Sequence, residues 1–211
     1  MPYLVLVRHG QSRWNLENRF TGWRDINLSP YGIKEAKQAG KLLKKNNFIF
    51  DIAYTSVLIR AIKTLGIILK VMQHPKMPIK KNKALNERDY GKLIGMNKDE
   101  ARKRFGEEQV HIWRRSYDVA PPGGESLKDT ANRALPYFNK YIMKDIKKGK
   151  NVLVSAHGNS LRAIIMKLDK LTKEQVLKLE IPTGVPIVYK FDKKGEILSK
   201  LLCKKNHKLY K

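Results

Sequence analysis

Two apolar runs that each end in a histidine and a glycine constrain the fold of this chain most strongly. Residues 3–7 run into an Arg-His-Gly triplet containing His9, and residues 151–156 run into His157. We expect both runs to be β-strands that place their histidines at one carboxyl edge of a single sheet, where open α/β sheets build their sites. A histidine beside an arginine there is suited to take a phosphoryl group onto nitrogen, because neutral imidazole is a nucleophile near pH 7.

Helical and strand-like segments alternate along the rest of the chain. Ser29 followed by Pro30 is a typical helix start, and Thr55 or Ser56 is expected to cap a second helix. Strands are expected at 3–7, 51–54, 78–80, 151–156, 185–191 and 196–201, and helices at 30–43, 56–72, 98–105, 107–115, 127–142 with a kink or break before Pro136, 160–168 and 173–179. This alternation predicts an α/β fold, with a mostly parallel sheet and helices on both faces.

No repeat, low-complexity segment or linker divides the 211 residues. We therefore expect one domain, 1–211, with a mobile basic tail from about residue 203. Cys203 is the only cysteine, which excludes a disulfide within the chain and favours a reducing cytoplasm. No apolar run is long enough to span a bilayer and the N-terminus lacks a signal-type segment, so no membrane association is expected.

The net charge of +25 allows two interpretations. One is a nucleic-acid or acidic-surface binder; the other is a solvated surface rich in lysine. We favour the second, because no nucleic-acid recognition motif accompanies the charge. The excess charge should nevertheless attract small phosphorylated substrates.

Short blocks spread over nearly the whole chain carry a family resemblance. They are Leu6–Gly10, Asn15, Asn18–Trp23, Tyr54–Leu58, Arg60-Ala61, Leu85–Arg88, Tyr90-Gly91, Trp113–Arg115, Pro121-Pro122, Ala156–Ser160 and Ile181–Pro186. In this order they resemble the histidine phosphatase superfamily, and within it the 2,3-bisphosphoglycerate-dependent phosphoglycerate mutases. A lone Arg-His-Gly would be weak evidence, whereas the ordered set is specific.

The resemblance implies a catalytic set of His9, Glu87, His157, Arg8 and Arg60. His9 would carry the phosphoryl group, and His157 would be protonated to stabilise the transition state. Glu87 would donate and accept the proton, and a carboxylate beside an anionic phosphate has its pKa raised toward the range useful for both steps. The two arginines would surround the phosphoryl group, since their planar forks match phosphate oxygens.

The substrate-binding residues implied by the same resemblance form a larger group. They are Arg8, Asn15, Thr21, Gly22, Arg60, Glu87, Arg88, Tyr90, Lys98, Arg114, Arg115, Gly158 and Asn159. The adjacent pair Arg114 and Arg115 repel each other, and a multiply charged ligand gripped by both resolves that conflict. Phosphoglycerate, with a carboxylate and a phosphate, is such a ligand.

The resemblance implies reversible interconversion of 3-phosphoglycerate and 2-phosphoglycerate through a phosphohistidine, primed by 2,3-bisphosphoglycerate. Small phosphorylated three-carbon acids are the expected partners, nucleic acid and membrane are not, and a homo-oligomer (dimer or tetramer) in the cytoplasm is implied. No metal is expected, because the sequence lacks a carboxylate–histidine cluster at ligand spacing and arginines supply the countercharge.

Three other functions stay open at this point. A broad phosphatase would hydrolyse the phosphohistidine with water, a basic binder would have no catalysis, and a regulatory relative would be inactive. The sequence also departs from the family pattern: Gln11 and Asp89 replace a glutamate and a histidine, and the stretch from Trp113 to Ser126 is short. The basic end of the chain is either solvated or a lid over the site.

Overall fold

A computed structural model of the protein describes residues 1–74 and 76–203. Within these residues six strands form one sheet in the order β3-β2-β4-β1-β5-β6. The strands are β1 (Tyr3–Arg8), β2 (Ile52–Thr55), β3 (Ile79–Lys81), β4 (Val152–Ala156), β5 (Pro186–Phe191) and β6 (Ile197–Leu202). The pairs β3–β2, β2–β4 and β4–β1 are parallel, whereas β1–β5 and β5–β6 are antiparallel. The predicted mostly parallel α/β sheet is confirmed.

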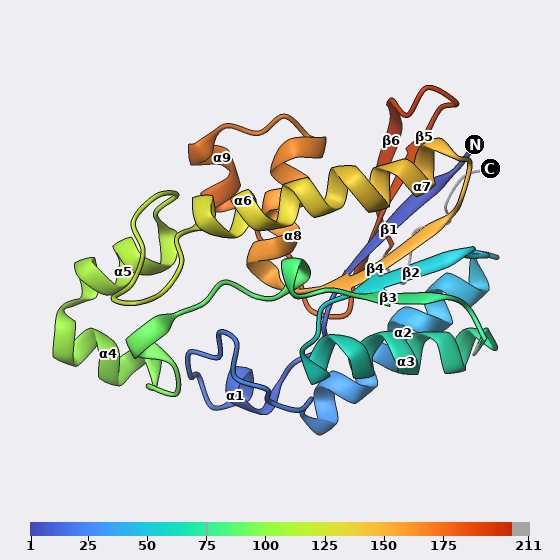
Figure 1. Ribbon diagram of the computed structural model, residues 1–211. Helices are drawn as coiled ribbons and strands as arrows, with labels where there is room; N and C mark the ends of the chain where they lie inside the picture. Colours follow the sequence, from blue (N-terminus) through green and yellow to red (C-terminus); the bar gives the residue numbers. More distant parts are fainter. Residues whose placement is uncertain (75, 204–211) are drawn as a thin grey trace.

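Helices cover both faces of this sheet (Figure 1). The α-helices are α1 (Arg13–Leu16), α2 (Pro30–Lys45), α3 (Ile59–Met72), α4 (Lys98–Phe105), α5 (Glu107–Arg115), α6 (Leu127–Tyr137), α7 (Lys144–Lys147), α8 (Gly158–Leu168) and α9 (Lys173–Lys178). Two short 3₁₀-helices, η1 (Lys83–Leu85) and η2 (Gly91–Leu93), and a π-helix, η3 (Phe138–Met143), complete the set. Helices α2 and α3 lie on one face of the sheet, and α6, η3, α7 and α8 lie on the other.

Two hydrophobic clusters follow from the alternation of side chains along each strand. Leu4 and Leu6 of β1 pack toward α6 and α8, whereas Val5 and Val7 pack toward α2 and α3. Both faces of the inner strands are buried, so these strands are continuous apolar runs, as buried parallel strands are. The core therefore fixes the carboxyl ends of β1 and β4, which are adjacent and in register up to Arg8 and Ala156.

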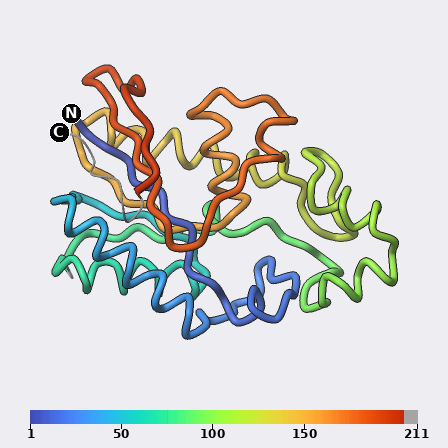
Figure 2. Tube along the Cα trace, turned by 180° about the vertical axis from the view of Figure 1, so that it is seen from behind, coloured from blue at the N-terminus to red at the C-terminus, as the bar shows by residue number. Residues whose placement is uncertain are grey.

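A separate lobe extends beyond the carboxyl edge of the sheet. It comprises α4 and α5 and has its own small apolar cluster, formed by Phe20, Leu93, Ala101 and Val110. Figure 2 shows this lobe, in green, projecting away from helices α2 and α3. The lobe brings the cationic side chains of α4 and α5 over the end of the sheet.

Two local predictions are wrong. Helix α3 begins at Ile59, with Leu58 as a cap that uses no side chain. Ser56 lies two residues before this cap, where its hydroxyl accepts the N–H of Leu58 at 3.2 Å and contacts His157. Helix α6 does not break before Pro136 but continues through it into η3. Buried Ala134 and Phe138 hold this segment against the core, which compensates for the hydrogen bond that proline cannot donate.

All three residues of the edge strand β3 are exposed, and two of them are Lys80 and Lys81.

No helix among the described residues is long and apolar enough to cross a membrane. The predicted mobile tail, and its role as a lid, lie outside the described residues apart from Cys203, which is buried.

Candidate active site

His9 lies immediately after β1, and its side chain is almost completely buried. Its Nδ1 lies 2.7 Å from the carbonyl oxygen of Gly10. A carbonyl oxygen only accepts hydrogen bonds, so Nδ1 carries the proton and Nε2 carries the lone pair. Burial, and then the charges of Arg60 and Arg8, lower the pKa of His9 to about 3. The imidazole is therefore neutral near pH 7, as a nucleophile requires.

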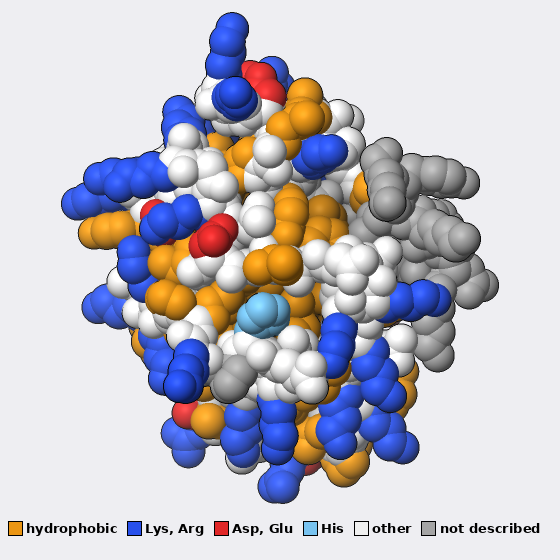
Figure 3. Space-filling model, turned by 90° about the vertical axis from the view of Figure 1, so that its right-hand side faces the viewer, with side chains coloured by type: hydrophobic (Ala, Val, Ile, Leu, Met, Phe, Trp, Pro, Cys, Tyr) orange, Lys and Arg blue, Asp and Glu red, His pale blue; other side chains and the backbone are white. Residues whose placement is uncertain are grey.

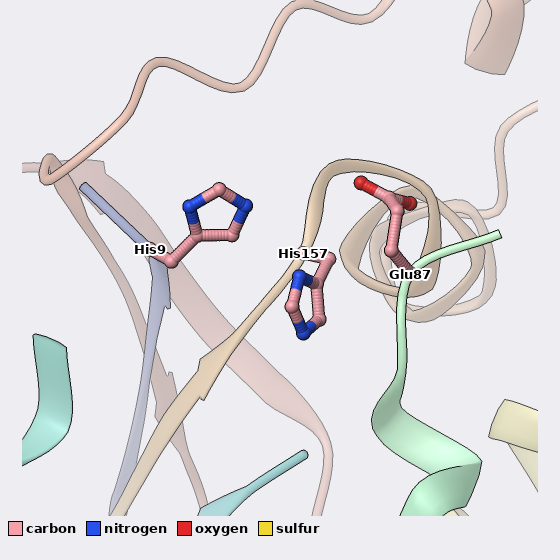
Figure 4. Close-up of side chains that lie close together, drawn as sticks. All are labelled: His9, Glu87 and His157. Carbon is pink, nitrogen blue, oxygen red and sulfur yellow. The ribbon is translucent and has the colours of Figure 1, made fainter. Parts of the chain in front are cut away.

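His157 follows β4 and faces His9, as the two matching runs predicted (Figure 4). The ring centroids lie 4.9 Å apart with an interplanar angle of 59°, so the rings are tilted and not stacked face to face. Its Nε2 lies 2.7 Å from the hydroxyl of Ser56. Its buried Nδ1 has no hydrogen-bond partner in the described part of the chain, which is typical of an atom that meets a ligand.

The protonation expected for His157 in the transition state stays a prediction, and the protein groups around the ring oppose it. Burial, followed by the charge of Arg60, lowers the pKa of this imidazole well below its ordinary value. An anion between the two rings would oppose both effects, because a negative charge favours the imidazolium form.

Glu87 completes the group, and its carboxylate lies at the first turn of α8 (Figure 4). The carboxylate accepts the N–H groups of Gly158 at 3.1 Å and Asn159 at 3.0 Å, and the Asn159 amide at 2.9 Å. These donors come from the N-terminus of a helix that starts two residues earlier than predicted.

The raised pKa expected for Glu87 beside an anionic phosphate stays a prediction, and the protein groups alone act in the opposite direction. Burial alone would raise it, but Arg8, the N–H of Arg88 and Arg60 outweigh burial and lower it to about 2. Glu87 is therefore ionised near pH 7. A bound phosphate would raise the pKa again, because like charges disfavour ionisation.

Arg8 and Arg60 are held by backbone carbonyls on either side of these three residues. Arg8 donates to the carbonyl of Ile181 at 2.8 Å, and Arg60 donates to that of Gly22 at 2.8 Å. The Nε of Arg8 is buried without a partner among the described residues. Gly22 adopts a φ of +51°, a conformation that favours glycine and that turns its carbonyl toward Arg60.

A pocket of about 180 Å³ contains most of the predicted site. It is lined by Arg8, His9, Asn15, Thr21, Gly22, Arg60, Glu87, Tyr90, Lys98, Arg114, Arg115, Gly158 and Asn159, and also by Arg19, Phe20, Arg162 and Glu180. Lys98 and Arg114 are half-buried there, and burial lowers the pKa of each. The cations of the α4–α5 lobe and those around His9 thus face one cavity.

The comparisons with known proteins agree with this architecture. The model of the histidine phosphatase superfamily (branch 1) matches residues 4–203. The chain belongs to the histidine phosphatase superfamily.

Relatives named 2,3-bisphosphoglycerate-dependent phosphoglycerate mutase are similar over nearly their whole length. The protein of Parvibaculum lavamentivorans is 59% identical over 93% of this chain and 94% of its own, and that of Nitrobacter hamburgensis is 59% identical over 94% and 96%. Among solved structures, Bacillus stearothermophilus YhfR has a TM-score of 0.81 at 27% identity, covering 93% of this chain and 94% of its own. A mycobacterial glucosyl-3-phosphoglycerate phosphatase, at 23% identity, TM-score 0.80 and coverage of 99% and 100%, shares the fold.

Two of the predicted residues do not line the pocket of this superfamily member. Arg88 is buried behind it, where its guanidinium donates to the carbonyl of Arg114 at 3.0 Å and to the hydroxyl of Tyr90 at 3.1 Å. The prediction that Arg88 lines the pocket as a donor is therefore wrong, because both contacts are to protein. His157 also stays behind the lining, although its ring faces His9.

Sequence reasoning missed four residues that line the pocket, Arg19, Phe20, Arg162 and Glu180. Arg162 donates to the Oδ1 of Asn159 at 3.3 Å, and Glu180 accepts from Arg115 at 2.7 Å. Arg162 stands one helical turn after Asn159, so the helical spacing of three was the signal that pointed to it. Arg115 is thus already paired by Glu180, a contact across 65 positions that no local pattern indicated.

The fold does bring possible metal ligands together, although the sequence shows no such cluster. His9, Glu87 and His157 bring three ligand atoms within 4.8 Å of one another, a cluster hidden by their separation in sequence. The positive charges of Arg8 and Arg60 beside this cluster disfavour a divalent cation. The absence of a metal stays a prediction.

Proposed function

We propose that this chain interconverts 3-phosphoglycerate and 2-phosphoglycerate reversibly, through a phosphohistidine on His9 that 2,3-bisphosphoglycerate primes. The observation that carries the proposal is the second group of cations in the pocket of His9, formed by Lys98 and Arg114, with Arg115 beside them in its pair with Glu180. A ligand with a transferable phosphate and a further anionic group matches both groups of cations. Relatives 59% identical that are named as such mutases support the same substrate.

In priming, the Nε2 lone pair of His9 attacks the phosphorus of 2,3-bisphosphoglycerate. A bond forms between nitrogen and phosphorus while the bond between phosphorus and the ester oxygen breaks. Glu87, whose pKa the bound phosphate raises, gives its proton to that oxygen as it leaves. The Nδ1 proton of His9 stays hydrogen-bonded to the carbonyl of Gly10 throughout. The phosphoryl group is thus stored on a nitrogen from which an alcohol can later take it.

In the return transfer, the free hydroxyl of the bound acid attacks the phosphorus of the phosphohistidine. An oxygen–phosphorus bond forms while the bond from Nε2 to phosphorus breaks, and His9 leaves as the neutral imidazole. Glu87 is ionised and takes the proton of that hydroxyl, and it returns a proton to the leaving oxygen in the reverse direction. We propose that Arg8, Arg60, Asn15 and the free Nδ1 of His157 surround the oxygens of the transferred group.

One sample tests the mutase proposal against a phosphatase. The protein is incubated with 2,3-bisphosphoglycerate, acid-labile phosphate is mapped, and isomerisation of 3-phosphoglycerate is compared with release of inorganic phosphate. We expect phosphate on His9, isomerisation much faster than phosphate release, and neither activity in His9→Ala. Rapid phosphate release without isomerisation, or isomerisation by His9→Ala, would contradict the proposal.

We propose that residues 1–211 act as a single domain, in the cytoplasm, and as a homo-oligomer. The family match over 4–203 supports one functional unit. The oligomeric state is open to direct measurement by sedimentation.

A further inference from the structure

The peptide unit that joins Gly10 to Gln11 is hydrogen-bonded on both sides. Its carbonyl oxygen accepts the Nδ1 proton of His9 at 2.7 Å, and its N–H donates to Oε2 of Glu35 at 2.7 Å. A peptide is a planar conjugated unit, so a carboxylate on the N–H side strengthens the carbonyl as an acceptor. Glu35 therefore connects to the ring of His9 through one peptide bond.

The other carboxylate oxygen of Glu35 contacts the loop before β5. Oε1 accepts the hydroxyl of Thr183. Thr183 forms a parallel bridge with Arg8, and the N–H of Gly184 donates to the carbonyl of Arg8 at 3.0 Å. One carboxylate thus joins the loop after β1 to the loop before β5, and both loops carry the residues next to the pocket.

Close packing leaves this carboxylate little freedom. Gly184 has a φ of +65°, and a Cβ built on it would lie 2.6 Å from the Cβ of Glu35. A Cβ built on Gly10 would lie 2.2 Å from the carbonyl oxygen of Gly32, so the turn after His9 rests directly on the first turn of α2. Glu35 itself does not line the pocket of His9, and it faces a separate hollow of about 420 Å³.

We propose that Glu35 is a positioning residue for phosphoryl transfer, which acts on His9 through the Gly10–Gln11 peptide. The negative charge of Glu35 strengthens the carbonyl that holds the Nδ1 proton, and so keeps the lone pair on Nε2. When Nε2 bonds to phosphorus, the ring becomes cationic while Nδ1 keeps its proton. The strengthened carbonyl stabilises that cation. The inference rests on the proposed function only in taking His9 as the nucleophile.

Glu35→Gln and Glu35→Ala separate charge from shape. In Glu35→Gln the new side chain keeps an oxygen for the N–H of Gln11 and an amide for Thr183, but loses the charge. We expect the single-turnover rate of His9 phosphorylation to fall roughly 10-fold in Glu35→Gln and roughly 100-fold in Glu35→Ala, by analogy with the loss of groups that orient metal-bound histidines. The KM for phosphoglycerate should change less than about twofold, because the lining of the pocket is unchanged.

Two control variants identify which contact matters. Thr183→Val removes the hydrogen bond to Oε1 and leaves the one to the N–H of Gln11, so phosphorylation should stay near the wild-type rate. Gln38 lies one turn after Glu35 on α2 and lines the same hollow, so Gln38→Ala should leave the rate of His9 phosphorylation unchanged. A loss in Thr183→Val as large as that in Glu35→Ala would overturn the relay through Gln11.

Nitrogen-15 NMR of His9 tests the proposal without any turnover. We expect the population with the proton on Nδ1 to decrease in Glu35→Ala, and the Nδ1 proton resonance to move upfield in Glu35→Gln as its hydrogen bond weakens. If Glu35→Ala fails to fold, the resonance in Glu35→Gln decides, and an unchanged resonance overturns the proposal. A wild-type protein that never phosphorylates His9 would contradict the proposed function and leave this measurement valid.

Discussion

The two histidines of the pocket are held in a state that they would not adopt in water at mildly acid pH. Burial and the neighbouring Arg60 lower the pKa of both rings. The site thus keeps His9 as a neutral base beside cations, at the expense of folding free energy in acid. The loss of unfolding free energy in acid that His9 causes can therefore be measured with a single substitution.

Replacing His9 by glutamine should reduce the acid sensitivity of folding. The pKa of His9 is about 3 in the folded protein, below its ordinary value of 6.5, so the unfolded chain binds the proton first as pH falls. The contribution of His9 to stability is therefore lost progressively from about pH 6.5 toward pH 3, by about 2 kcal/mol between pH 7 and pH 5. Urea unfolding of wild type and His9→Gln at both pH values should show this difference, and parallel pH dependences would contradict it.

At the scale of elements, the contact between α2 and the turn after β1 fixes the nucleophile. Gly10 and Gly32 meet there with no room for a side chain on either. The position of the His9 backbone is therefore set by a helix that does not itself line the pocket. The same helix carries Glu35, so one element supplies both the contact and the charge.

Alanine substitutions at two helical glycines should have opposite effects on stability. A Cβ on Gly32 would lie 2.1 Å from the carbonyl oxygen of Gln11, whereas one on the exposed Gly66 of α3 meets nothing within 4 Å. Gly32→Ala should cost about 1–3 kcal/mol through overpacking and should also slow catalysis. Gly66→Ala should stabilise the protein by about 0.5–1 kcal/mol, because alanine is the better helix former. Urea unfolding measures both changes in unfolding free energy. An equal change in the two variants would show that the backbone around Gly32 moves apart without cost.

At the scale of the whole molecule, positive charge is spread widely over the surface. Figure 3 shows lysine and arginine side chains over much of one face, with few acidic ones among them. With a net charge of +25, this distribution attracts anions in general and specifies none. Specificity comes from the pocket, where the cations are partly buried.

Binding to duplex DNA should therefore reflect charge alone. We expect weak retention at low salt that is independent of base sequence and is lost at moderate salt, since released counterions drive such binding. Fluorescence titration of two unrelated duplexes over a salt series checks this. A preference for one duplex that persists at moderate salt would favour a nucleic-acid function instead.

The sequence was sufficient for the sheet and for the centre of the site, because both depend on local patterns. The runs before His9 and His157 are apolar on both faces, and this pattern predicted adjacent buried strands. The contacts of Ser56, Arg88 and Arg115 could not be predicted from the sequence. Each side chain could also act near its own position, as a helix cap or as a donor to substrate, and only tertiary packing selects the distant partner. The ionisation of Glu87 depends likewise on groups distant in sequence, first the charge of Arg8 and also the N–H of Asn159.

The exposed strand β3 has a consequence for assembly. Two copies joined edge to edge along β3 would bring Lys80 and Lys81 of each chain close to those of the other, and like charges across a strand pair repel. Sheet extension at this margin is thereby discouraged. We therefore expect an oligomer of this protein to associate through surfaces other than β3, which leaves the outer backbone of this strand in water.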